Sequence, residues 1–190
     1  MKKIITFFGI LFLVTISLQS CKPDDIYYDL SNDAKGFVNF EIGDAFKLKN
    51  LNTNEIITLN VITKNILYEN YGSGESSFIS FGVAPAETYV QRASYTFTDN
   101  LNCYKGEISV VANEEGDFTL TALIDGCFGN LGSVYQYNNL FFSTVDVEGI
   151  QYQNAYLLNS NSNNLYYSKE KGILKIVNQP KNITLFSYVE

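Results

Sequence analysis

The residues best suited to reactive chemistry in this 190-residue chain are its three cysteines, Cys21, Cys103 and Cys127. A nucleophilic cysteine or serine needs a neighbouring base, which is usually histidine. The chain contains no histidine and no Cys-x-x-Cys pair. The sequence therefore excludes histidine-dependent hydrolase sites and gives no sign of a zinc or redox motif. We expect no metal site and no cofactor.

Carboxylate chemistry remains open, because the chain has 20 Asp and Glu residues. A glycosidase places two carboxyl groups about 5–10 Å apart, and the two can be distant in sequence. No spacing in this chain singles out such a pair. The sequence favours a protein that is not an enzyme, and a glycan-active enzyme with a carboxylate pair is the alternative hypothesis.

The N-terminal segment predicts export from the cytoplasm. Lys2 and Lys3 precede residues 4–16, which carry no charge. A basic start followed by a short apolar run is typical of a secretory signal peptide. The run is shorter than the roughly 20 residues that a spanning helix needs. We therefore expect a signal peptide rather than a membrane-spanning anchor.

The end of this segment, Leu18-Gln19-Ser20-Cys21, resembles a bacterial lipobox. In lipoproteins with this motif, the cysteine thiol takes a diacylglycerol and the peptide bond before the cysteine is cut. The resemblance implies that residues 1–20 are a lipoprotein signal peptide and that Cys21 is the lipid attachment site. Two acyl chains are enough for stable membrane anchoring. An ordinary signal peptide with a chance cysteine is the alternative.

Three further segments resemble lipoproteins of the Bacteroidota. Lys22-Pro23-Asp24-Asp25 is similar to the acidic export signal that follows their lipidated cysteine, and residues 43–61 and 163–176 are similar to segments of small surface lipoproteins from the same group. The resemblance implies an outer-membrane location on the cell surface, and the periplasmic face is the alternative. It implies no particular activity.

Residues 103–127 predict a β-hairpin with a defined register. A three-residue loop at residues 114–116 sets Asn113 opposite Asp117. In this register the even positions form an apolar face. The odd positions form a mostly polar face, on which Lys105 lies opposite Asp125, and Leu123 and Val111 are apolar exceptions. A shift of one residue would mix the two faces, so the pattern supports this register.

The same register places Cys103 directly opposite Cys127. Facing residues of paired strands have Cα atoms about 4.5–5.5 Å apart, which a disulfide can bridge. Disulfides persist in exported proteins because their surroundings are oxidising. We therefore predict a Cys103–Cys127 disulfide, worth about 3 kcal/mol of stability. Two free thiols are the alternative.

The charge of the chain argues against nucleic acid as a partner. The net charge is −7, and loss of residues 1–20 would remove two lysines and no acid, which lowers it to −9. Nucleic-acid binding requires clustered Lys and Arg, which are absent. An acidic surface is also unsuited to electrostatic binding of anionic lipid. Membrane contact is therefore assigned to the lipid anchor.

The remaining pattern predicts an all-β fold. Tyr and Phe, at 14 residues each, suit pleated surfaces, and short alternating runs are separated by turn residues. We expect one antiparallel β-sandwich or β-barrel of roughly ten to twelve strands, connected mainly by hairpins. The predicted organisation is a signal peptide at 1–20, an acylated cysteine and polar tether at 21–35, and a β domain at 36–190.

Two aromatic and amide-rich segments, residues 135–139 and 152–154, could contribute to a binding surface. Tyrosine supplies a rigid contact area with a polar tip. The simpler interpretation is that these tyrosines are half-buried strand residues and the asparagines are turn residues. Together the observations favour a binding or structural module, with an unknown glycan or protein as its ligand.

Overall fold

The structure is a computed structural model that describes residues 24–73, 86–114, 116–126, 133–179 and 181–190. The signal peptide, the lipobox and both Cys21 and Cys127 lie outside the described residues, so the predictions for them stay predictions. Within the described segments, no helix is both long and apolar enough to cross a membrane.

The prediction of an all-β fold is confirmed. In the described part of the chain, eleven strands and two short helical turns make up the regular structure. In chain order they are β1 (Ile26–Tyr28), α2 (Asn32–Lys35), η1 (Gly36–Val38), β2 (Ala45–Asn50), β3 (Ile56–Ser73), β4 (Glu87–Thr98), β5 (Tyr104–Ala112), β6 (Phe118–Gly126), β7 (Ser133–Val147), β8 (Ile150–Asn159), β9 (Asn163–Ser168), β10 (Gly172–Asn178) and β11 (Ile183–Val189).

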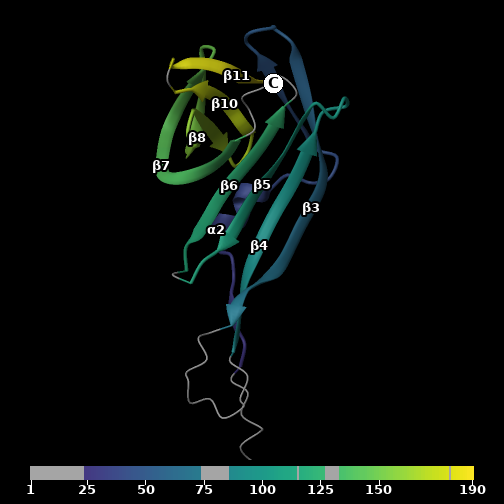
Figure 1. The fold of residues 1–190 in the computed structure, drawn as a ribbon. Helices are drawn as coiled ribbons and strands as arrows, with labels where there is room; N and C mark the ends of the chain where they lie inside the picture. Colours follow the sequence, from purple (N-terminus) through teal and green to yellow (C-terminus); the bar gives the residue numbers. More distant parts are fainter. Residues whose placement is uncertain (1–23, 74–85, 115, 127–132, 180) are drawn as a thin grey trace, which may run out of the picture.

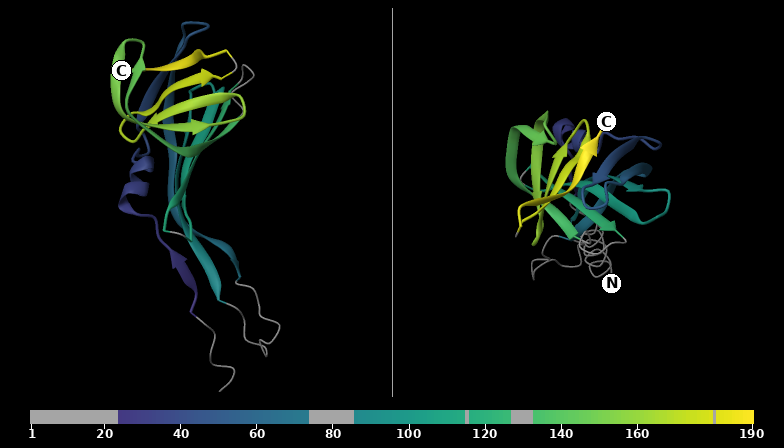
Figure 2. Two further views of the ribbon diagram at one scale, coloured as in Figure 1. Left: turned by 90° about the vertical axis from the view of Figure 1, so that its left-hand side faces the viewer. Right: turned by 90° about the horizontal axis from the view of Figure 1, so that it is seen from above.

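The strands form a single sheet in the order β1-β4-β3-β2-β11-β10-β9-β8-β7-β6-β5, and β4 also pairs with β5. Strands that follow one another from β2 to β11 are antiparallel neighbours, which confirms the expected hairpin connections. Each of these strands therefore has a partner on both sides, and the sheet bends into a barrel-like domain. Strands β8 to β11 run across strands β3 to β6 (Figures 1 and 2).

The alternating pattern of the strands explains the core. In β3, Ile57, Leu59 and Val61 are buried while the residues between them are only half-buried. Strands place alternate side chains on opposite faces, so one apolar residue in two is enough to fill the interior. Among the described residues, the largest fully buried side chains come from six strands and η1: Phe37, Tyr95, Phe97, Ile108, Leu120, Leu158, Leu165, Tyr167, Ile173, Leu174 and Ile176.

The predicted register of the β5–β6 hairpin is confirmed. Val110 pairs with Leu120, and Lys105 pairs with Asp125. The last described pair is Tyr104 with Gly126, one step before the two cysteines. Because Cys127 lies outside the described residues, the disulfide itself remains a prediction.

The N-terminal segment differs from the predicted polar tether. From Ile26 onward it is part of the fold, since β1 pairs in parallel with β4 and Leu30 is buried. Ser31 caps α2 by accepting a hydrogen bond from the backbone N–H of Ala34. The β domain therefore starts near Ile26 and not near Gly36. A distant strand pairs with β1, and Leu30 is buried in the fold; no local pattern reveals these contacts.

Phe37 in η1 packs into the interior between β6, β8 and β9. Its ring lies 5.2 Å from that of Phe118 and 4.6 Å from that of Tyr156. The hydroxyl of Tyr167 donates a hydrogen bond of 2.5 Å to the carbonyl of Phe37. Nearby, Lys169 binds a carboxylate oxygen of Asp33 in α2 at 2.6 Å, and its Nζ lies 4.3 Å from the centre of the Phe37 ring. These contacts fix the N-terminal segment on the barrel-like domain.

Candidate functional site

A hollow among the described core residues is too small for a ligand. This hollow, between the core residues Leu48, Phe97, Tyr104 and Phe186, measures about 10 Å³, which is at the lower limit for one water molecule. Small-molecule sites usually measure hundreds of cubic ångströms. A binding site must therefore be sought on the surface.

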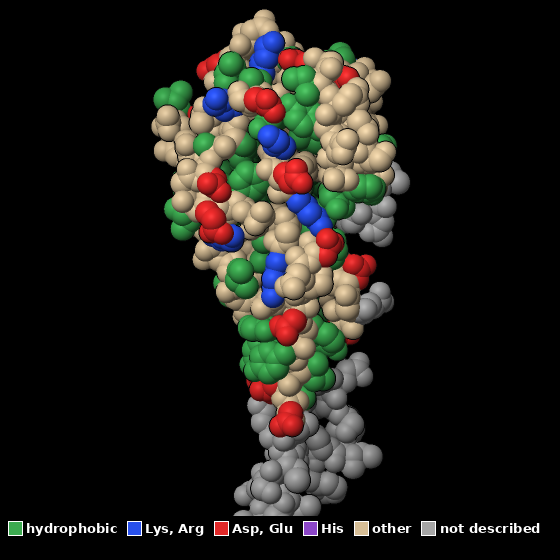
Figure 3. Space-filling model, turned by 180° about the vertical axis from the view of Figure 1, so that it is seen from behind, with side chains coloured by type: hydrophobic (Ala, Val, Ile, Leu, Met, Phe, Trp, Pro, Cys, Tyr) green, Lys and Arg blue, Asp and Glu red, His purple; other side chains and the backbone are tan. Residues whose placement is uncertain are grey.

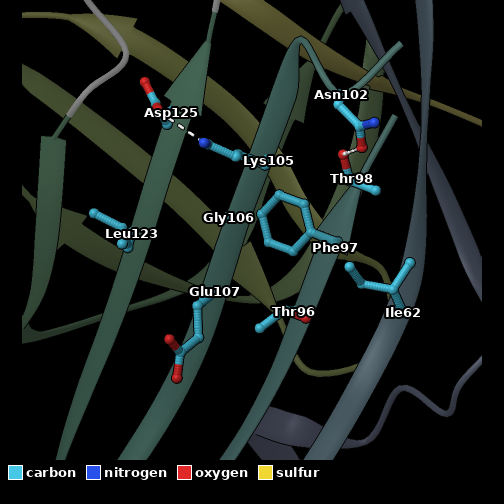
Figure 4. A pocket seen from close by; sticks show the side chains of 10 residues that line it. All are labelled: Ile62, Thr96, Phe97, Thr98, Asn102, Lys105, Gly106, Glu107, Leu123 and Asp125. Carbon is cyan, nitrogen blue, oxygen red and sulfur yellow. Dashed lines mark hydrogen bonds and ion pairs between the residues drawn. The ribbon is translucent and has the colours of Figure 1, made fainter. Parts of the chain in front are cut away.

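A groove of about 620 Å³ lies on the outer face of β3 to β6 (Figure 4). Its position follows from the confirmed hairpin register, because odd-numbered residues of β5 and β6 point away from the core. The groove is lined by Ile62, Thr96, Phe97, Thr98, Asn102, Lys105, Gly106, Glu107, Leu123 and Asp125. We call this surface the outer groove.

Gly106 is required at the floor of the outer groove. It pairs with Phe97 on β4, and a Cβ atom at this position would lie 2.3 Å from the carbonyl oxygen of Leu123 and 2.5 Å from the Phe97 ring. Such separations are too short for any side chain, so only glycine lets the three strands lie this close. The floor is therefore bare backbone with the edge of Phe97.

The walls of the outer groove carry exposed apolar side chains. Ile62 is 51% exposed and Leu123 is 47% exposed. Ile62 follows the buried residues Ile57, Leu59 and Val61 of β3, so strand alternation places it on the outer face, at a register shift in the β3–β4 pairing. The sequence contained a signal for Leu123, since it broke the polar face of the predicted hairpin. What the sequence did not show is that Ile62 and Leu123 lie on the same groove.

Charged pairs stand at both ends of the groove. Lys105 and Asp125 approach to 3.8 Å and are both well exposed, so the pair contributes little to stability. Arg92 donates to Glu107 at 2.7 Å and also contacts Glu69 at 3.4 Å. Partial burial lowers the pKa of Arg92, but the hydrogen bond and the negative charge of Glu107 outweigh it and raise the pKa above its usual value. The guanidinium is therefore a fixed positive charge.

The chemistry of the outer groove suits a polypeptide better than a sugar. Sugar sites commonly use an exposed aromatic ring as a platform, and the only aromatic lining residue, Phe97, is almost fully buried. Both carboxylates of the groove, Glu107 and Asp125, contact a cation. In the described part of the chain, no group of three or more His, Cys, Asp or Glu residues is arranged to hold a metal.

The aromatic segments noted in the sequence lie elsewhere. Tyr152 is buried and packs in a second, smaller core with Val145, Leu174 and Tyr188. Gln136 in β7 is exposed, while the side chains of Tyr135 and residues 137–139 are not among those described. Of the described side chains in these two segments, those of Gln136 and residues 152–154 do not line the outer groove. Their interpretation as strand residues therefore holds for Tyr152.

Comparison of the chain with protein-family models, with curated proteins and with solved structures finds no match. The geometry of the surface and the sequence motifs are therefore the grounds for assigning a function.

Proposed function

We propose that this protein is a lipid-anchored lipoprotein of the bacterial outer membrane that binds a protein partner through the outer groove. The observation that carries the proposal is the contrast between a filled interior and an open groove of about 620 Å³ on the outer face. A barrel-like domain without an inner chamber can bind only at its surface. The groove combines exposed apolar groups with charges at its ends.

The lipid anchor rests on the lipobox resemblance at Cys21 and on the way the chain continues. The fold begins at Ile26, five positions after this cysteine. Lys22-Pro23-Asp24-Asp25 therefore suffices as the connection between the acylated residue and the sheet. The similarity of this segment to the export signal of Bacteroidota lipoproteins supports the cell surface as the location.

An extended polypeptide fits the outer groove for a physical reason. Ile62 and Leu123 can receive apolar side chains, while Thr98 and Asn102 offer hydrogen-bonding groups. Interfaces of this kind combine an apolar centre with a polar rim. The glycosidase alternative needs one carboxyl group that carries a proton and faces its substrate, whereas the carboxylates here contact Arg92 and Lys105. We therefore place binding before catalysis.

The binding proposal is tested by photocrosslinking in intact cells. A benzoylphenylalanine at position 123 is compared with one at position 150, because Leu123 and Ile150 are similarly exposed and Ile150 lies outside the groove. We expect a discrete crosslinked protein from position 123 only, and its loss when Ile62 is changed to Asp. Equal crosslinking from both positions, or insensitivity to Ile62→Asp, would contradict the proposal.

The anchor is tested separately by metabolic labelling with palmitate. Wild-type protein should incorporate the label and float with the outer membrane, whereas Cys21→Ala should do neither. Protease treatment of intact cells then reports the side of the membrane. Equal labelling of both proteins would remove the anchor from the proposal without affecting the groove.

A further inference from the structure

One end of the sheet projects beyond the barrel-like body. It consists of β1, residues 68–73 of β3 and residues 87–91 of β4, and we call it the stem. β4 pairs with β5 only from Arg92 onward, so the stem contains no more than these three strands. It forms the narrow lower part of the molecule, at the end where the described chain begins (Figures 1 and 2).

The stem concentrates the exposed apolar side chains of the protein. Of the 14 large hydrophobic residues that are exposed in the described part of the chain, four lie on it (Ile26, Tyr27, Tyr68 and Tyr71), and Ile66 and Leu67 lie next to it on β3. Figure 3 shows these groups gathered over the narrow end of the molecule, with Asp and Glu beside them. Soluble surfaces scatter such residues, and a concentration of them marks a contact with a protein or a membrane.

Three tyrosines build one ordered face of the stem. Tyr27 stacks on Tyr89 with ring centres 5.0 Å apart, and the edge of Tyr68 meets Tyr27 at 5.4 Å. The register explains the cluster, since Tyr27 pairs directly with Tyr89. Tyr27 remains 55% exposed and Tyr68 remains 44% exposed. The rings therefore present a preformed aromatic surface.

Acidic groups border this surface. The stem and the residues next to β1 contain Asp24, Asp25, Asp29, Glu69 and Glu87 and no Lys or Arg, and Arg92 at the border of the stem pairs with Glu69. The hydroxyl of Tyr68 donates to Asp29 and that of Tyr89 donates to Glu87. The bond to Glu87 is the main cause that raises the pKa of Tyr89 to about 12. Neutral phenol rings beside carboxylates attract an ammonium group and repel an anionic one.

The stem lies close to the proposed lipid attachment site. Only residues 22–25 separate Cys21 from Ile26, and a chain extends at most about 3.6 Å per residue, so Ile26 lies within about 18 Å of a lipidated Cys21. Tyrosine is enriched at the headgroup level of bilayers, where one end of the ring is apolar and the other is wet. We propose that the aromatic face of the stem lies in the headgroup layer of a zwitterionic membrane, with lipid ammonium groups against Tyr27, Asp29 and Glu87. This inference rests on the lipid anchor proposed above.

The absence of tryptophan from the chain allows a clean test. Tyr27→Trp places a single reporter on the stem, and Phe141→Trp places the matched control on β7, where the side chain is 50% exposed. Each acylated protein is reconstituted into vesicles of phosphatidylcholine and phosphatidylethanolamine that carry a nitroxide on the headgroup. We expect several-fold stronger nitroxide quenching at position 27 than at 141, and the reverse order for quenching by iodide in water.

Further measurements with other lipids and ligands distinguish the possible outcomes. Replacing phosphatidylethanolamine with anionic phosphatidylglycerol should weaken nitroxide quenching at position 27. Protein that floats with the vesicles while position 27 stays open to iodide would overturn this inference and leave the anchor intact. Protein that fails to float would overturn both. If the fluorescence at position 27 does not change with lipid but changes on addition of an oligolysine peptide, the stem would bind a basic protein and not a membrane. Tyr71→Trp repeats the test if Tyr27→Trp lowers the melting temperature.

Discussion

Replacing Tyr167 with Phe should lower the free energy of unfolding at neutral pH. It should also make the decrease of this free energy with rising pH less steep above pH 10. Tyr167 is fully buried and donates a 2.5 Å hydrogen bond to the carbonyl of Phe37. Its hydroxyl also shares a hydrogen bond of 3.2 Å with Tyr95. Removing a partner from a buried polar pair costs about 1–3 kcal/mol. We expect Tyr167→Phe to lose about 2 kcal/mol of unfolding free energy at pH 8.

The alkaline effect follows from the pKa values of the two buried phenols. Burial raises the pKa of Tyr167 and that of Tyr95 well above the ordinary value of 10. Above pH 10 the unfolded chain releases these protons while the folded chain keeps them, so the unfolded state is favoured as pH rises. Each buried tyrosine then costs about 1.4 kcal/mol of stability per pH unit, and below pH 10 the contribution is fully present.

Tyr167→Phe lacks one of these two groups, so its stability should fall less steeply above pH 10. A deficit of about 2 kcal/mol is made up after about 1.5 pH units, which predicts that the two stability curves cross near pH 11.5. Urea unfolding followed by circular dichroism between pH 8 and pH 12 gives both curves. Parallel curves would refute the reasoning, because they would mean that Tyr167 ionises equally in both states. The control Tyr166→Phe removes a hydroxyl from the opposite face of β9 and should stay within about 0.5 kcal/mol of wild type at pH 8.

Three further changes test the packing and the predicted crosslink. Gly106→Ala should destabilise the fold by about 1–3 kcal/mol in urea unfolding, because its Cβ would lie 2.3 Å from the carbonyl oxygen of Leu123; an unchanged midpoint would contradict the close approach. Lys169→Met should lose about 1–2 kcal/mol through its contacts with α2 and η1, whereas Lys171→Met, whose ion pair is exposed, should lose less than about 0.5 kcal/mol. Cys103→Ser should cost about 3 kcal/mol in the oxidised protein and nothing relative to reduced wild type, and two free thiols in oxidised wild type would refute the disulfide.

The β5–β6 hairpin shows how far local pattern predicts this fold. Its register followed from an apolar face, a mostly polar face and a loop containing Gly116, all of which lie within 25 consecutive residues. Gly116 has a φ of +79°, as a loop-closing glycine requires. The pairing of Lys105 with Asp125 was predicted in the same way and is present at 3.8 Å. Local information was sufficient here because both strands carry the pattern.

The N-terminal segment shows where local pattern is insufficient. Residues 26–30 contain four bulky side chains with acids around them. The sequence predicted a tether here because no neighbouring segment could pack against these side chains. In the fold, β1 pairs with β4 about 60 positions later, and the backbone N–H of Leu30 donates to the side chain of Gln91. The outer groove required distant information as well, since the pairing of β3 with β4 and of β4 with β5 brings Ile62 and Leu123 to the same surface. Contacts of this range have no signature in a short window of sequence.

The two proposed surfaces are consistent with each other because β4 carries both. Tyr89 lies in the stem, while Thr98 lines the outer groove nine positions further along the same strand. At about 3.3 Å per residue, this places the groove about 30 Å from the stem. A stem in the headgroup layer would therefore hold the groove clear of the lipid, where a partner in the aqueous phase can reach it. An extended ladder of β3–β4 hydrogen bonds joins the two surfaces. These paired strands therefore act as a stiff spacer between the membrane and the outer groove. The short segment after Cys21 need not provide this separation.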